Sequence, residues 1–186
     1  AYEIMPSLVG SEMCIRHSIY TVRRATQGFA DYINEAFDKP SVAIAYDSRI
    51  KSDVFAKAAA GVFAANGIHV YIYGELMPTP MLSFAVRELN CQAGVMVTAS
   101  HNPSKYNGYK AYGADGCQLN LTDAETVIKK VNALDMFDGV KHIKFDDAVE
   151  SGMVEYIGQS VIDKFYENVL AQGLNTNPVS YTHLTL

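Results

Sequence analysis

The spacing of apolar residues predicts a long amphipathic helix over residues 20–37. Val22, Phe29 and Ile33 recur at intervals of seven and four, which places them on one face of a helix. Pro40 follows this pattern, and proline cannot continue a helix because its ring fixes φ and it lacks an amide hydrogen. We therefore expect the helix to end before Pro40 and an extended segment to begin there.

Short apolar runs then alternate with longer helical patterns. Three runs have the length of β-strands, at residues 41–45, 68–73 and 93–98. Helical patterns follow these runs at residues 52–65, 80–89 and 122–134, and Ser52 or Asp53 is suited to cap the first of them. Strands that alternate with helices of this length imply right-handed crossovers and a mainly parallel sheet covered on both faces. The predicted fold class is α/β.

The last part of the chain has weaker periodicity. Residues 139–152 are polar and acidic, and an amphipathic segment at 157–170 follows them. We expect a linker and then an isolated helix that begins a second domain. The acidic pair Asp146 and Asp147 is expected in an exposed turn.

Both ends of the chain resemble translated sequencing adapters. Residues 13–16 can be encoded by ATG TGT ATA AGA, and the reverse complement of that string encodes residues 180–183. We do not expect such residues to pack against the fold, because they were never selected to fit it. The predicted organisation is adapter-derived residues 1–16, a first domain at 17–146, a linker with the truncated start of a second domain at 147–178, and adapter-derived residues 179–186.

Composition and charge exclude several classes of protein. The 186 residues are 49% hydrophobic, and 15 Lys and Arg stand against 20 Asp and Glu, for a net charge of −5. Without a basic run there is no electrostatic footprint for nucleic acid or an acidic membrane surface. The longest uncharged apolar stretch, at 58–68, is shorter than the roughly 20 residues that cross a bilayer. Three cysteines without a CxxC pair favour reduced thiols in a cytoplasmic protein.

Candidate chemistry is concentrated in residues 98–110, which read TASHNPSKYNGYK. The segment follows an apolar run, so we expect it at the carboxyl end of a parallel strand, where α/β proteins bind ligands. A serine held on such a turn, Ser100, can attack a phosphoryl or acyl group, and His101 and Lys110 are the nearest groups able to accept its proton. A polar turn without a catalytic role is the competing interpretation, because Ser, Asn and Pro are common turn formers.

The same string resembles the phosphoserine loop of the α-D-phosphohexomutases, the phosphoglucomutase and phosphomannomutase family. Four other segments resemble the family in order: residues 20–28 (its bacterial phosphoglucomutase-type branch), 44–49 (its strand and DxR segment), 77–80 (its PTP turn) and 112–118 (the segment after the loop). The likeness covers nearly all of residues 17–178. One departure is Ala45 and Tyr46, which stand where many members have Gly-Arg.

The resemblance implies a three-layer α/β/α domain whose Ser100 carries a phosphate. The enzyme it implies interconverts hexose 1-phosphates and 6-phosphates, with glucose as the expected sugar and glucose 1,6-bisphosphate as the activator. In this family Mg²⁺ bridges the serine phosphate and three aspartates of a DGDxDR-type loop, and this sequence contains no such loop. We therefore expect this chain alone to be inactive, with Ser100 supplying one metal ligand.

The resemblance also implies roles for residues near Ser100. Lys110 and His101 are candidates for the general acid or base, or for contacts to phosphate. Asn102 and Arg49 are candidates for binding the phosphosugar substrate. The residues alone leave alternatives open, because Asn102 also suits a turn and Arg49 also suits an ion pair with Asp47 or a role in orienting the serine loop.

Two other functions stay open at this stage. One is a non-catalytic module that binds phosphosugars, and the other is a serine hydrolase that uses Ser100 and His101. The hydrolase lacks a GxSxG motif, and we do not expect an adjacent serine and histidine on one tight turn to face each other.

Overall fold

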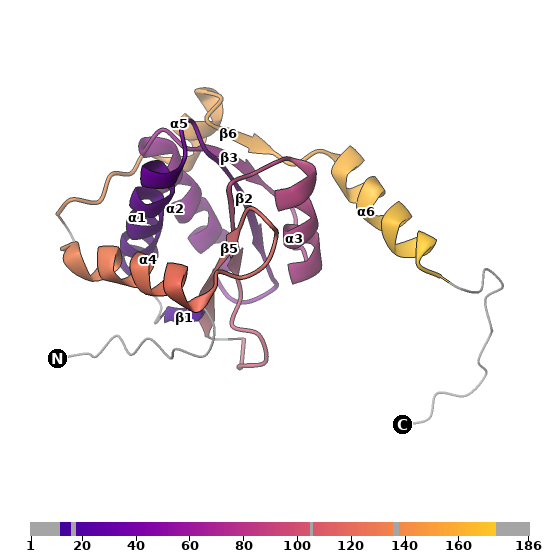
Figure 1. Cartoon of the computed structure of the whole chain (residues 1–186), viewed down its shortest axis with the longest axis horizontal. Coiled ribbons are helices and arrows are strands. Elements are labelled where there is room, and N and C mark those ends of the chain that lie inside the picture. The colour runs from indigo at the N-terminus through magenta and orange to yellow at the C-terminus, as the bar shows by residue number, and fades with distance from the viewer. Residues whose placement is uncertain (1–11, 16–17, 105, 136–137, 174–186) are drawn as a thin grey trace.

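The computed structural model describes residues 12–15, 18–104, 106–135 and 138–173, and it contains one sheet between two layers of helices (Figure 1). Its elements are, in chain order, β1 (Glu12–Ile15), α1 (Ile19–Ala36), β2 (Ser41–Tyr46), α2 (Ser52–Ala65), β3 (His69–Ile72), α3 (Thr79–Glu88), β4 (Ala93–Val97), β5 (Asn107–Gly113), α4 (Leu121–Ala133), α5 (Phe145–Glu150), β6 (Val154–Tyr156) and α6 (Gln159–Ala171). The strand order is β1-β5-β4-β2-β3-β6. Neighbours from β4 to β6 are parallel, whereas β5 runs antiparallel to both β4 and β1. The predicted α/β class with a mainly parallel mixed sheet is confirmed.

The central strands are apolar on both faces because helices cover both faces. In β2, Val42 and Ile44 belong to the core beneath α1, α2 and α4, whereas Ala43 and Ala45 belong to the core beneath α3. Figure 1 shows α1, α2 and α4 on one side of the sheet and α3 on the other. A strand buried on both faces reads as a continuous apolar run, which is the pattern that predicted β2 and β4.

Helix α1 forms where the apolar spacing predicts it. Ser18 caps it by accepting a hydrogen bond from the amide of Tyr20 at 3.2 Å. Gly28 permits a close approach to α4, because a Cβ there would lie 2.4 Å from Cγ2 of Val131. The missing side chain thus lets two helices of one layer pack tightly.

Residues 154–156 are part of the sheet, although no strand was expected between the polar segment at 139–152 and the helical segment at 157–170. They form β6, whose Val154 lies opposite Val70 of β3 in parallel register. The expected isolated helix is wrong, because α6 packs on α3 through the rings of Phe84 and Phe165, with centroids 5.6 Å apart. A three-residue strand is too short to produce a recognisable period of two. The start of a second domain stays a prediction.

The acidic pair Asp146 and Asp147 is exposed, as expected, but it lies in a helix rather than in a turn. Both residues occupy the first turn of α5. Acidic side chains there interact favourably with the positive end of the helix dipole. Ala148 of the same helix is fully buried in the core that α1 and α2 share, so α5 belongs to the fold.

Strand β1 corrects the expectation that residues 1–16 pack against no part of the fold. It pairs antiparallel with β5, with Glu12 opposite Lys110 and Ile15 opposite Asn107. Pairing at a sheet edge uses backbone groups, so it makes little demand on side chains. The other residues expected to be adapter-derived, 1–11, 16 and 179–186, lie outside the described residues. The adapter origin stays a prediction.

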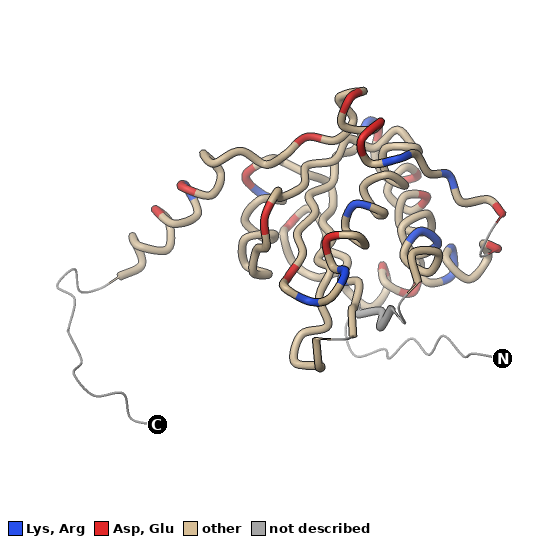
Figure 2. The backbone as a smooth tube through the Cα atoms, turned by 180° about the vertical axis from the view of Figure 1, so that it is seen from behind, with Lys and Arg blue, Asp and Glu red and all other residues tan. Residues whose placement is uncertain are grey.

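None of the described helices is long and apolar enough to cross a bilayer. Figure 2 shows basic and acidic positions interspersed along the backbone, without one face of a single sign in this view. The absence of nucleic-acid partners and the cytoplasmic location stay predictions.

Candidate functional site

Two loops meet at the carboxyl ends of β2 and β4, which are neighbours in the sheet. The chain leaves β2 through α2 to reach β3 on one side, and then passes through α3 to reach β4 on the other side of β2. The direction of connection therefore reverses between β2 and β4. Open α/β sheets bind ligands outside such a reversal. The loops there are residues 47–51 and 98–106.

The first loop is a turn held by hydrogen bonds from Ser52. The hydroxyl of this buried serine donates to the backbone oxygen of Asp47 and, at 2.9 Å, to that of Arg49. Lys51 has a left-handed backbone with φ of 65° and precedes α2 without a capping side chain. The expected cap from Ser52 or Asp53 is therefore wrong, because the Ser52 hydroxyl holds the turn instead.

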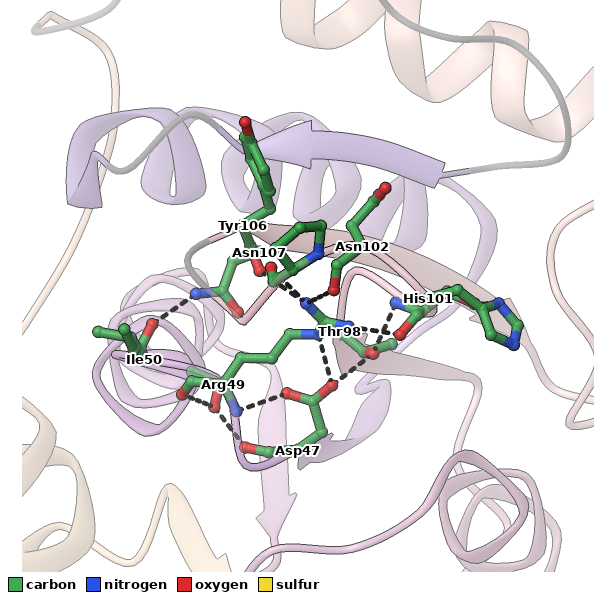
Figure 3. A network of polar contacts seen from close by, with 11 residues as sticks. Asp47, Arg49, Ile50, Thr98, His101, Asn102, Tyr106 and Asn107 are labelled. Carbon is green, nitrogen blue, oxygen red and sulfur yellow. Dashed lines mark hydrogen bonds and ion pairs between the residues drawn. The ribbon is translucent and has the colours of Figure 1, made fainter. Parts of the chain in front are cut away.

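Arg49 joins the two loops (Figure 3). Its Nε donates to Oδ2 of Asp47 at 3.0 Å, and its side chain is only 9% exposed. Its terminal nitrogens reach four backbone oxygens of the second loop, those of Ser100, Asn102 (2.6 Å), Pro103 (2.9 Å) and Tyr106 (3.2 Å). Both structural roles open to Arg49 from the sequence, pairing with Asp47 and orienting the serine loop, occur together.

Ser100 is exposed and has a left-handed backbone with φ of 54°. Such a conformation is uncommon for residues other than glycine and occurs often at functional sites. The amide of Ser100 donates to Oγ1 of Thr98 at 3.1 Å, and that hydroxyl donates to Oδ2 of Asp47 at 2.6 Å. The side chain of Ser100 is thus exposed to solvent, on a backbone that Thr98 and Asp47 hold in place.

His101 contacts Ser100, so the expectation that these side chains do not face each other is wrong. Nδ1 of His101 lies 3.1 Å from Oγ of Ser100. Consecutive side chains point to opposite sides only in an extended chain, and the left-handed conformation of Ser100 interrupts that alternation. The serine and a potential base are therefore within hydrogen-bonding distance.

Lys110 and Asn102 lie in different surroundings. Lys110 is in the body of β5, opposite Met96 of β4, and only 7% exposed. The adjacent residues Tyr109 and Ala111 belong to the core beneath α1, α2 and α4. Side chains alternate between the two faces along a strand, so Lys110 lies on the face of the sheet that α3 covers. Asn102 is an exposed turn residue whose amide donates to the oxygen of Ala99 at 3.1 Å. The interpretation of Asn102 as a turn former fits this geometry.

Asn107 holds the two loops together, and the sequence alone did not single it out. Its buried Nδ2 donates to the oxygen of Ile50 at 2.7 Å, and the amide of Ile50 donates to the oxygen of Ser104 at 3.3 Å. The following Gly108 permits close pairing of β5 with the end of β4, because a Cβ there would lie 2.5 Å from the oxygen of Thr98. The Asn-Gly pair was the available signal, although it usually indicates a turn.

Comparison with known families decides the identity of the fold. Residues 12–137 match the family described as "Phosphoglucomutase/phosphomannomutase, alpha/beta/alpha domain I". The chain belongs to this family. The resemblance noted in the sequence is thereby confirmed.

Relatives of known name support this membership. A phosphoglucomutase from Staphylococcus saprophyticus is 38% identical over 154 residues, which cover 83% of this chain and 28% of that protein. A phosphoglucomutase from Staphylococcus aureus strain NCTC 8325 is 46% identical over 111 residues, which cover 60% of this chain and 20% of that protein. The chain thus spans less than a third of the length of these relatives.

Solved structures share the arrangement of elements. A putative phosphomannomutase from Thermus thermophilus superposes with a TM-score of 0.75 at 27% identity, covering 90% of this chain and 36% of that one. A phosphoglucomutase/phosphomannomutase family protein from Burkholderia thailandensis superposes with a TM-score of 0.72 at 20% identity, covering 91% of this chain and 36% of that one. The second likeness concerns the fold alone.

The described residues do not by themselves fit a metal ion. Within them, no group of three His, Cys, Asp or Glu side chains is placed to hold one. Mg²⁺ prefers near-octahedral oxygen ligands, and Ser100 would contribute a single one through a phosphate. The carboxylate of Asp47, close to Ser100, is instead engaged with Arg49 and Thr98.

Proposed function

We propose that this chain is the phosphoserine domain of a phosphohexomutase, and that Ser100 carries a phosphoryl group between the 1- and 6-positions of a hexose phosphate, with glucose as the expected sugar. The observation that carries the proposal is the presentation of Ser100, exposed and left-handed at the reversal between β2 and β4. Phosphoryl transfer depends mainly on positioning and on neutralising charge, and a rigid exposed turn supplies the positioning.

The proposed transfer runs in both directions at Ser100. Oγ attacks the phosphorus of a sugar bisphosphate, the bond from Oγ to phosphorus forms, and the bond from phosphorus to the sugar oxygen breaks. The proton on Oγ passes to Nδ1 of His101, which lies 3.1 Å away, while the sugar oxygen takes a proton from water. In the reverse direction the phosphoserine gives its phosphoryl group to the free hydroxyl of the sugar, the proton of that hydroxyl passes to water, and Oγ takes back the proton from His101.

Lys110 and Arg49 are assigned different parts in this proposal. We assign Lys110 a supporting role in transfer, as a buried cation on the strand that follows the loop. Arg49 positions the loop, because its Nε and Nη1 donors are already engaged with Asp47 and with loop carbonyls. The substrate-binding roles of Arg49 and Asn102 stay predictions.

Mg²⁺ is the expected metal, and glucose 1,6-bisphosphate is the expected activator. A phosphate on Ser100 would be one oxygen ligand for Mg²⁺, and the described residues supply no acidic set to complete the site. Divalent metal would supply charge neutralisation for the transferring group when bound. We therefore expect no measurable turnover of glucose 1-phosphate by this chain alone.

One observation favours a serine hydrolase as a second candidate. The contact between Ser100 and His101 is the nucleophile–base pair that such an enzyme requires. A hydrolase also needs a group that orients the histidine, and among the described residues no carboxylate is bonded to His101. The hydrolase is separated from the mutase by incubating the chain with a simple ester, which only the hydrolase would cleave. A binding module without catalysis would never carry phosphate.

The test uses an intact enzyme that contains this domain. In this grafted enzyme, the 154 residues that align with Staphylococcus saprophyticus phosphoglucomutase replace their counterparts in that protein. We expect it to convert glucose 1-phosphate to glucose 6-phosphate and to carry phosphate on the grafted segment. The matched control carries Ser100→Ala, which should keep the fold and lose both properties.

Circular dichroism and the thermal midpoint establish that the graft is folded. A folded graft that neither turns over substrate nor incorporates phosphate from glucose 1,6-bisphosphate would contradict the proposed function. Activity that persists after Ser100→Ala would contradict it as well.

A further inference from the structure

The two peptide groups on either side of the Ser100 Cα are both linked by hydrogen bonds to one carboxylate oxygen, Oδ2 of Asp47. The amide of Ser100 reaches Oδ2 of Asp47 through the hydroxyl of Thr98, by contacts of 3.1 and 2.6 Å. The carbonyl of Ser100 reaches the same oxygen through Arg49, whose Nη2 donates to the carbonyl and whose Nε donates to Oδ2 at 3.0 Å. These contacts form a closed ring around the left-handed residue.

We propose that Asp47 is a positioning residue, which holds Ser100 in its left-handed conformation and thereby sets the direction in which Oγ faces the phosphoryl group. The proposal rests on the proposed function of Ser100 as phosphoryl carrier. Thr98 and Arg49 transmit the effect, since each contacts both Asp47 and Ser100.

The carboxylate of Asp47 receives three donors. Oδ1 accepts the backbone amide of Arg49 at 3.1 Å, while Oδ2 accepts both Nε of Arg49 and the hydroxyl of Thr98. An asparagine can turn its one acceptor oxygen toward Nε of Arg49 and the hydroxyl of Thr98 and so keep the ring, whereas an alanine offers no acceptor. Asp47→Ala therefore breaks the ring.

The ring is separable from the contacts that keep the two loops together. Asn107 bonds to the oxygen of Ile50, and the amide of Ile50 bonds to the oxygen of Ser104. Ser52 holds the turn through the backbone oxygen of Asp47 rather than through its carboxylate. Loss of the carboxylate thus leaves the loops joined and releases the conformation of Ser100.

The first arm of the test measures conformation in the full chain and needs no activity. The backbone angle φ of Ser100 is determined by NMR from the coupling between the amide and α protons and from carbon shifts. We expect a positive φ in the wild type and in Thr98→Ser, which keeps the hydroxyl. We expect a negative φ in Thr98→Val and in Asp47→Ala. Asp53→Ala, at an acidic residue in the first turn of α2, is the matched control and should leave φ positive.

The second arm measures kcat and KM of the grafted enzyme with the same substitutions. We expect Asp47→Ala and Thr98→Val to lower kcat about 100-fold while KM stays unchanged, because a nucleophile misplaced by about 1 Å loses rate rather than affinity. Thr98→Ser should restore most of the rate. A purely structural role would instead lower the thermal midpoint and leave kcat of the folded fraction unchanged.

The two arms separate this inference from the proposed function. A positive φ in Asp47→Ala or Thr98→Val would overturn the positioning role whatever the enzyme does. Equal kcat in Thr98→Val and the wild type would overturn it too. If the unsubstituted graft is folded but inactive, the proposed function fails, and the NMR arm still decides whether Asp47 sets the conformation of Ser100.

Discussion

Oγ of Ser100 and Nδ1 of His101 lie 3.1 Å apart on adjacent residues of one tight loop. The contact arises because Ser100 is left-handed, which turns two consecutive side chains toward the same region. A serine hydroxyl is a weak nucleophile until a base removes its proton. The loop therefore carries both groups that the first step of the proposed phosphoryl transfer needs.

His101→Gln in the grafted enzyme separates proton transfer from hydrogen bonding. Glutamine can accept a hydrogen bond from Ser100 but cannot hold the transferred proton, so we expect transfer to slow about 10²- to 10⁴-fold. The rate is measured by rapid mixing with glucose 1,6-bisphosphate. If His101→Gln reacts as fast as the wild type while His101→Ala is slow, His101 only holds the loop.

Lys110→Met removes a buried ammonium group and keeps the length of the side chain. We expect Ser100 still to accept phosphate, with transfer slowed about 10²- to 10⁴-fold, because Lys110 supports transfer without being the carrier. The exposed Lys129→Met on α4 is the matched control and should leave the rate unchanged. Complete loss of phosphate from a folded Lys110→Met enzyme would contradict this assignment.

Gly28→Ala tests the close packing of α1 on α4. The added Cβ would lie 2.4 Å from Cγ2 and 2.7 Å from the backbone nitrogen of Val131, so the two helices must move apart. We expect the free energy of unfolding in urea to fall by about 1–3 kcal/mol. Gly158→Ala is the control, since its nearest neighbour would be Oγ of Ser160 at 3.9 Å. Equal stability of the two variants would show that the interface adapts without cost.

We expect ionisation of Cys91 to make the free energy of unfolding fall as the pH rises in the alkaline range. Burial raises the pKa of its thiol from 9.0 to about 11. Between these values the unfolded chain loses this proton and the folded chain keeps it, so rising pH favours unfolding. We expect this group to lower the free energy of unfolding by about 1 kcal/mol between roughly pH 8 and pH 10. Urea titrations at a series of pH values should show a shallower decline of the free energy of unfolding in Cys91→Ala than in the wild type. An identical decline in both proteins would refute the effect.

Much of the fold could be predicted because burial on both faces leaves a clear mark in the sequence. The apolar runs of β2 and β4 and the spacing along α1 follow directly from what these elements bury. Element β6 escaped prediction because three residues carry too little pattern, and its place in the sheet depends on pairing with β3, which is distant in sequence.

The candidate site could be predicted in composition but not in geometry. Ser100, His101 and Arg49 were identifiable because their residue types suit the chemistry and lie at the end of an apolar run. Their contacts depend on two features that a local pattern does not reveal. One is the left-handed backbone of Ser100, and the other is the approach of the loop after β2 to the loop after β4.

Mass spectrometric mapping of phosphate in the grafted enzyme decides whether Ser100 carries the phosphoryl group. Ser104 is the rival position, since it is exposed on the same loop. After incubation with glucose 1,6-bisphosphate, we predict phosphate on Ser100, its loss in Ser100→Ala and its retention in Ser104→Ala. Phosphate mapped to Ser104, or normal phosphate cycling in Ser100→Ala, would contradict the account.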